Sequence, residues 1–215
     1  MSALILAQAA HERAVRHLTR RDEALRAIVA RHGTPPLWPR PTGFRVLAKM
    51  ILEQQVSLDS AATLFRRLDR ELPGGLRAAP LGALGVSRAA MRLRARGVTR
   101  QKSKYIATLA VRVHGEPGWM RSVTRASDDA ALEALTSLPG IGPWTAGVYL
   151  LFALRRPDIW PPGDLALHIA MGEMLGRGAP LPSREATQFA ERWAPHRATA
   201  ARILWHGYLS DRGRK

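Results

Sequence analysis

Asp164 is the carboxylate best placed in this sequence to do chemistry, because it follows the stiff segment 161–163 and opens an apolar run. Taken alone, it is explained most simply as a helix N-cap, since a capping carboxylate accepts hydrogen bonds from the free amides of the first turn. Asp158 also lies nearby, but the segment 155–158 is typical of a turn. We therefore interpret Asp158 as structural.

A second segment with possible chemistry lies about twenty residues earlier, at residues 138–143, between two expected helices. Gly140 and Gly142 permit positive φ and a close approach of another backbone. The helix that begins near Pro143 would direct free amides and the positive end of its dipole outward, which suits a phosphate oxygen. Many such connectors bind nothing, so this hairpin becomes informative only together with Asp164.

The elements that must position these residues are expected to be helices, because apolar residues recur at helical spacing along most of the chain. No strand-like alternation is present, so the expected fold class is all-α. Residues 74–75 and 82–85 are expected to be short connectors. The expected helices are 4–18, 22–29, 44–52, 60–68, 98–113, 127–135, 142–154, 164–175, 183–193 and 198–209.

Composition restricts the partners and the chemistry. Lys and Arg number 33 against 17 Asp and Glu, a net charge of +16, which favours a polyanion such as nucleic acid. A basic interaction protein remains the alternative, and the arginines between 88 and 100 are interpreted as a solvated helix face. The absence of Cys excludes a disulfide scaffold and an iron–sulfur cluster. Without a membrane-length apolar run or a secretory leader, we expect a cytoplasmic protein, associated with the nucleoid through its polyanionic partner. We also expect a monomer.

The hairpin that ends in Trp144 and Thr145, followed by Pro-x-Gly-Asp, resembles the signature of the helix-hairpin-helix (HhH-GPD) DNA glycosylases. Within that superfamily the chain looks most like the 3-methyladenine DNA glycosylase II branch. Residues 43–57 and 97–106 are similar to two further elements of the branch, with Ser103 in the usual Ala position. The resemblance implies two helical lobes flanking an active-site cleft, in a single unit over residues 1–215 without an extra N-terminal sheet domain.

The same resemblance implies base excision repair: a monofunctional hydrolase that flips alkylated purines such as 3-methyladenine and 7-methylguanine out of damaged double-stranded DNA. Asp164 would stabilise the positive charge on the sugar and orient water. Trp144 stands where strand-nicking relatives carry Lys, so no AP lyase activity is expected. Trp144, Trp205 and Trp160 would line the base pocket, although core packing explains Trp205 equally well.

By the same resemblance, the corner at Gln54 and Gln55 would enter the minor groove. The hairpin residues Leu138, Gly140, Gly142 and Thr145 would bind DNA. The backbone carbonyls of Thr136, Leu138 and Ile141 would hold Na⁺ or K⁺, with no other cofactor.

Some positions depart from the pattern and leave alternatives open. Glu53 stands at a position where the family often has Gly, and Val148 replaces an aromatic pocket residue of some relatives. His168, on the helix after Asp164, is expected to be a surface or core histidine. One alternative is a glycosylase for uracil, hypoxanthine or oxidised bases. Another is a non-catalytic DNA-binding protein in which Asp164 only caps a helix.

Overall fold

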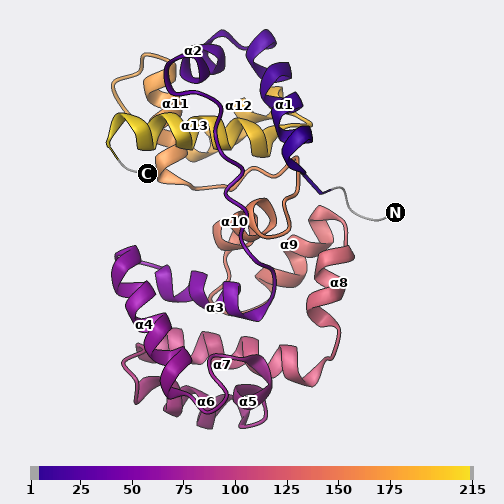
Figure 1. Cartoon of the computed structure of the whole chain (residues 1–215), viewed down its shortest axis with the longest axis vertical. Coiled ribbons are helices and arrows are strands. Elements are labelled where there is room, and N and C mark those ends of the chain that lie inside the picture. Colours follow the sequence, from indigo (N-terminus) through magenta and orange to yellow (C-terminus); the bar gives the residue numbers. More distant parts are fainter. Residues whose placement is uncertain (1–4, 214–215) are drawn as a thin grey trace. The chain divides into compact units, whose positions relative to one another are not determined.

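The computed structural model describes residues 5–213, which form helices joined by loops and contain no strand (Figure 1). The all-α prediction is confirmed. The described residues divide into two compact units, residues 40–146 and residues 5–39 with 147–213. The helices are α1 (Gln8–Arg21), α2 (Glu23–His32), α3 (Phe44–Glu53), α4 (Leu58–Glu71), α5 (Ala78–Gly82), α6 (Gly85–Arg94), α7 (Arg100–Gly115), α8 (Trp119–Arg125), α9 (Asp128–Thr136), α10 (Pro143–Phe152), α11 (Leu165–Met174), α12 (Ser183–Ala190), the 3₁₀ helix η1 (Glu191–Trp193) and α13 (Arg197–Asp211).

Helices α5 and α8 were not expected from the sequence, and α6 was expected only as a solvated helix face at the arginines between 88 and 100, without bounds. Helix α5 has five residues and α8 has seven, which is too short for a repeating apolar stripe. Helix α6 buries only Ala89 and Leu93, and three of its other eight residues are arginines. All three depend on tertiary packing for their apolar contacts, and sequence periodicity does not report this packing.

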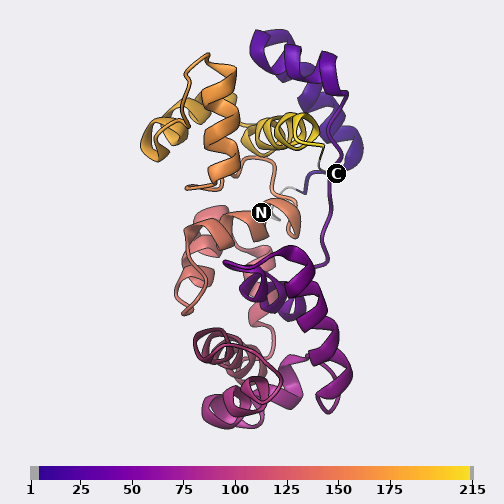
Figure 2. The same ribbon diagram turned by 90° about the vertical axis from the view of Figure 1, so that its left-hand side faces the viewer.

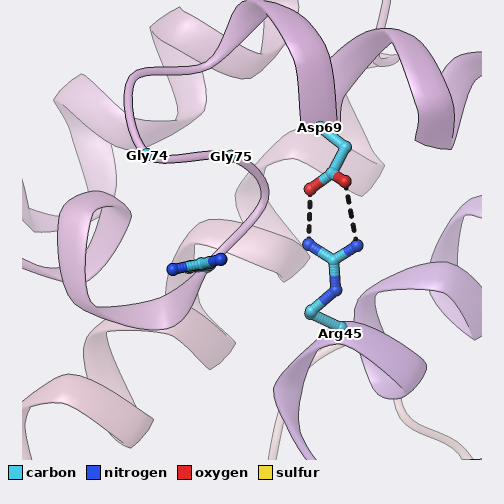
Figure 3. A pocket seen from close by; sticks show the side chains of 5 residues that line it. Arg45, Asp69, Gly74 and Gly75 are labelled. Carbon is cyan, nitrogen blue, oxygen red and sulfur yellow. Dashed lines mark hydrogen bonds and ion pairs between the residues drawn. The ribbon is translucent and has the colours of Figure 1, made fainter.

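The first unit is built around α7, which contacts α3, α5, α6 and α8. Its buried face includes Ile106 and Leu109. An ion pair between Arg45 of α3 and Asp69 of α4 joins these two helices (Figure 3). Asp69 also accepts a hydrogen bond from the amide of Leu76, beyond the turn at residues 74–75. This carboxylate therefore fixes the connection between α4 and α5.

The second unit is organised by α13, which contacts α1, α2 and α11 (Figures 1 and 2). Its eight residues from 198 to 205 are all buried. Arg202 is fully buried among them and donates to the carbonyls of Leu37, Leu151 and Ala198 at 2.7–3.0 Å. One guanidinium thus links α13 to the end of α10 and to the segment after α2.

Two buried polar contacts attach the N-terminal helices to the C-terminal ones. Nδ1 of His11 lies 3.3 Å from the hydroxyl of Thr199, and Nε2 lies 2.9 Å from the carbonyl of Pro35. The indole of Trp193 donates to Asp22, the N-cap of α2, at 2.9 Å. The N-terminal helices therefore belong to the same unit as α11–α13.

None of the helices in residues 5–213 is both long enough and apolar enough to cross a membrane.

Candidate active site

Asp164 is held at the start of α11 by the loop that precedes it. Gly163 has φ +75°, a left-handed conformation that favours glycine. Oδ1 of Asp164 accepts a hydrogen bond from the amide of Leu167 at 2.9 Å, and the residue is 7% exposed. The N-cap prediction is therefore confirmed, and the cap places a nearly buried carboxylate at a helix N-terminus.

The indole of Trp205 gives Asp164 a second donor. Nε1 of Trp205 lies 3.1 Å from the same Oδ1, and Trp205 is itself buried. Its ring stacks on Phe152 with centroids 5.2 Å apart and an interplanar angle of 25°. Trp205 thus has core packing and a polar contact with the candidate catalytic group at the same time.

Two residues that contact this part of the core, Phe152 and Arg202, were not identified as part of the site from the sequence. The guanidinium of Arg202 lies 5.3 Å from the centroid of the Phe152 ring. Burial lowers the pKa of Arg202 to about 9. Phe152 belonged to an apolar run, but no sequence signal identified Arg202, since its acceptors are carbonyls of distant segments.

The loop that carries Asp164 also packs closely on α10. A Cβ atom added at Gly147 would lie 3.1 Å from Cα of Pro161. Such a contact is tighter than side chains ordinarily make. Glycine at position 147 therefore allows the helix and the loop to approach each other.

The hairpin 138–143 belongs to the first unit, and its turn depends on Gly140. This residue has φ +86°, and an added Cβ would collide with the ring of Tyr105 on α7. Leu138 and Ile141 are buried, whereas Gly142 is exposed. The amide of Ile141 donates to the carbonyl of Leu138 at 3.2 Å, and α10 begins at Pro143.

Gln54 is brought together with this hairpin. Its Nε2 donates to the carbonyl of Gly140 at 2.9 Å and lies 3.3 Å from the hydroxyl of Thr145. The backbone at Gln54 is fixed as well, because Nζ of Lys102 donates to its carbonyl at 2.5 Å and to that of Leu52 at 2.7 Å. Burial lowers the pKa of Lys102. The sequence motif contained Lys102 but gave no indication of this role.

Gln55 differs from Gln54. Its side chain is exposed, and its backbone has φ +57°, which is rare for a residue with a side chain. The neighbouring Glu53, a departure from the family pattern, is paired with Arg40 at 3.4 Å and with Lys49 at 3.7 Å. Its negative charge is therefore balanced within the first unit.

The remaining tryptophans differ in their surroundings. Trp144, on the first turn of α10 in the first unit, is 41% exposed. Trp160, in the second unit, is half-buried against Trp193 with ring centroids 5.7 Å apart. Nε1 of Trp160 and Nε2 of His168 are buried and make no hydrogen bond within the described part of the chain. His168 is 8% exposed, so it is a core histidine rather than a surface one.

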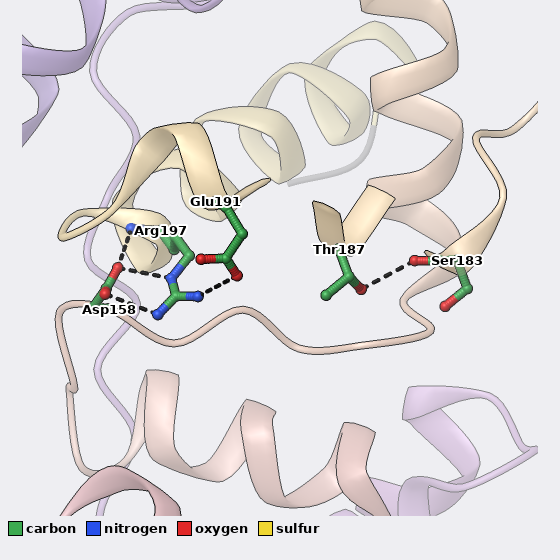
Figure 4. A network of polar contacts seen from close by, with 5 residues as sticks. All are labelled: Asp158, Ser183, Thr187, Glu191 and Arg197. Carbon is green, nitrogen blue, oxygen red and sulfur yellow. Dashed lines mark hydrogen bonds and ion pairs between the residues drawn. The ribbon is translucent and has the colours of Figure 1, made fainter. Parts of the chain in front are cut away.

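Two other predicted features were a cation site and a structural role for Asp158. The hydroxyl of Thr136 donates to the carbonyl of Leu132 at 2.8 Å. Within residues 5–213, no group of three His, Asp or Glu side chains could hold a metal ion, and the site for Na⁺ or K⁺ at backbone carbonyls stays a prediction. Asp158 forms an ion pair with Arg197 and accepts from its amide at 3.1 Å (Figure 4). The structural interpretation of Asp158 is confirmed.

Several known proteins are similar to this chain in sequence. No protein-family model matches the chain. It is 41% identical to a probable bifunctional transcriptional activator/DNA repair enzyme AlkA of Mycobacterium tuberculosis, over 33% of this chain and 14% of that protein. It is 27% identical to DNA-3-methyladenine glycosylase 1 of Schizosaccharomyces pombe, over 75% of this chain and 71% of that protein. The chain therefore spans only a small part of the first relative.

Solved structures are similar over most of the chain. A DNA-3-methyladenine glycosidase from Bacillus halodurans matches with a TM-score of 0.79 and 26% identity, covering 93% of this chain and 91% of that one. The S. pombe 3-methyladenine DNA glycosylase Mag1, in complex with abasic DNA, matches with a TM-score of 0.76 and 22% identity, covering 90% and 95%. The chain thus shares its fold with proteins of this kind.

Proposed function

We propose that this chain, which belongs to the helix-hairpin-helix superfamily of DNA glycosylases, hydrolyses the N-glycosidic bond of alkylated purines in duplex DNA. The observation that carries the proposal is the carboxylate of Asp164. It is nearly buried, and both the amide of Leu167 and the indole of Trp205 fix it through Oδ1. A second carboxylate near this motif, that of Asp158, is paired with Arg197 and is therefore not assigned this role.

In the proposed reaction, the damaged nucleotide leaves the duplex and the bond between C1′ and the purine nitrogen breaks. Flipping costs a few kcal/mol and less for a damaged base. The bonding electrons leave with the base, so positive charge develops on the sugar, and the carboxylate of Asp164 stabilises that charge. Water then attacks C1′ and loses a proton to a base, a role that Asp164 can take. The products are a free purine and an abasic site.

The residue at position 144 supports a monofunctional reaction and a cationic substrate. An indole has no amine to form a Schiff base with the sugar, so the proposed enzyme leaves the strand intact. Purines alkylated at N3 or N7 carry positive charge, which the face of an aromatic ring attracts. The side chain of Trp144 is exposed enough to offer such a face.

The proposed DNA contacts are the hairpin and the corner after α3. The amides at the start of α10 would hold a phosphate. The amide of Gln54 is already bound to the hairpin, whereas the side chain of Gln55 is exposed. We therefore assign the position in the minor groove to Gln55, and assign to Gln54 the task of joining that corner to the hairpin.

A panel of duplexes tests this function. Each duplex carries one lesion: 3-methyladenine, 7-methylguanine, uracil, hypoxanthine or 8-oxoguanine. We expect release of the methylated purines, with strand breaks only after alkali treatment. Breaks without alkali would overturn the monofunctional reaction, and exclusive release of a neutral base would overturn the substrate class. Tight binding of every duplex without release would indicate a non-catalytic DNA-binding protein.

A further inference from the structure

The second unit contains a cavity of about 650 Å³ that the proposed reaction does not use. One wall is α1, and the other walls are the segments 157–158 and 195–196. We call this cavity the α1 groove. Its volume falls within the range of ordinary ligand sites.

The floor of the α1 groove is apolar. Leu6, Ala10 and Ala14 recur every four residues and so lie on one side of α1 and the segment before it. Pro157 and the exposed Pro195 add further carbon surface to the lining of the groove. An aliphatic side chain could be buried here.

The rim of the α1 groove is cationic. Arg13, Arg16 and Arg20 are exposed, and none of them forms an ion pair with another residue in the part of the chain that the structure describes. The rings of His17 and His196 meet edge to face, with centroids 5.1 Å apart. The rim therefore offers three unpaired guanidinium groups beside an apolar surface.

The acid that lines the groove does not neutralise this rim. The guanidinium of Arg197 donates two hydrogen bonds at 2.9 Å to the carboxylate oxygens of Asp158, and Glu191 lies on the other side of the same guanidinium (Figure 4). Because Asp158 is paired with Arg197, it does not compete for the arginines of the rim. Carboxylates of a bound molecule can therefore pair with those arginines.

We propose that the α1 groove binds an acidic peptide segment of a partner protein, with an aliphatic side chain on the floor and carboxylates at the arginines. Arginine forks bind carboxylates through paired hydrogen bonds. A DNA backbone fits less well, because Leu6, Ala10 and Ala14 offer no side-chain donor to a phosphate. The proposal does not depend on base excision.

A fluorescence anisotropy titration tests the proposal. The probe is a short labelled peptide in which leucines are spaced among Asp and Glu residues, added to the full chain. We expect saturable binding that Arg13→Glu with Arg16→Glu weakens by about tenfold or more. Both side chains are exposed, so the double variant should keep its fold, which circular dichroism checks. Ala10→Trp fills the floor without changing charge and should also weaken binding.

Two controls separate this site from general charge attraction. Arg121→Glu with Arg125→Glu removes the same charge from exposed positions of α8 in the first unit and should leave peptide binding unchanged. Equal weakening by the two double variants would overturn the proposal. It would also be overturned if a peptide with Gly in place of Leu bound equally well, or if the groove variants lost affinity for duplex DNA and not for the peptide.

Discussion

Replacing Trp205 with phenylalanine tests whether the indole positions the carboxylate of Asp164. The substitution keeps an aromatic ring over Phe152 and removes the donor that lies 3.1 Å from Oδ1. The amide of Leu167 remains as a donor at 2.9 Å. A hydrogen bond to a charged group contributes about 1.5–3 kcal/mol, and about 1.4 kcal/mol corresponds to tenfold in rate. If the whole contribution acts in the transition state, base release slows by about tenfold to 150-fold.

The assay is single-turnover release of 3-methyladenine from a duplex with enzyme in excess, so that product release does not limit the rate. Trp193→Phe is a matched control. That indole is also buried in the second unit and donates to an N-cap aspartate, Asp22, at 2.9 Å. Both variants should lower the Tm, but only Trp205→Phe should slow the chemical step. The reasoning is refuted if both variants slow release equally, or if Trp205→Phe loses stability and keeps the parent rate.

Three further predictions concern the hairpin, the DNA corner and pH. Gly140→Ala should weaken duplex binding and lower the Tm more than Gly118→Ala does. Both sites have positive φ, but only at Gly140 would an added Cβ collide with Tyr105. An equal effect of the two variants in thermal melts and binding titrations would argue against a packed hairpin. Gln55→Ala should slow release from duplex DNA at an unchanged Tm, since its side chain is exposed; an unchanged rate would remove this residue from the groove. Burial lowers the pKa of His11, so its contribution to stability is present above about pH 6.5 and is lost as the pH falls below that value. In melts between pH 7.5 and 5.5, the Tm of His11→Gln should therefore decline less than the Tm of the parent.

The sequence predicted those parts of the fold that local chemistry determines. Asp164 as an N-cap follows from its type and from the Pro and Gly before it, and the hairpin follows from Gly140 and Gly142. Strong apolar runs predicted α10 and α11. The arginines between 88 and 100 indicated a helix face, but the bounds of α6 were not predicted, because only Ala89 and Leu93 are buried, which is too little for a recognisable stripe.

Long-range polar contacts could not be predicted in the same way. Gln54 and Gly140 are 86 residues apart, and the acceptor is a backbone carbonyl that every residue type provides. The same holds for Arg202, whose partners include carbonyls 165 and 51 residues away. An arginine in a helix ordinarily indicates an exposed helix face. Its burial here follows from the packing of the second unit around α13.

The central claim, that Asp164 carries the chemistry, is tested most directly by counting free base released by Asp164→Asn and by Asp158→Asn. Asparagine also caps helices well, so Asp164→Asn should keep α11 and lose the charge. Asp158→Asn removes the charge that pairs with Arg197 and serves as the matched control. We predict that Asp164→Asn lowers release from a 3-methyladenine duplex by about 10²–10³-fold, while Asp158→Asn stays near the parent rate despite a lower Tm. Release by Asp164→Asn at the parent rate would contradict the account and leave Asp164 as a helix cap alone.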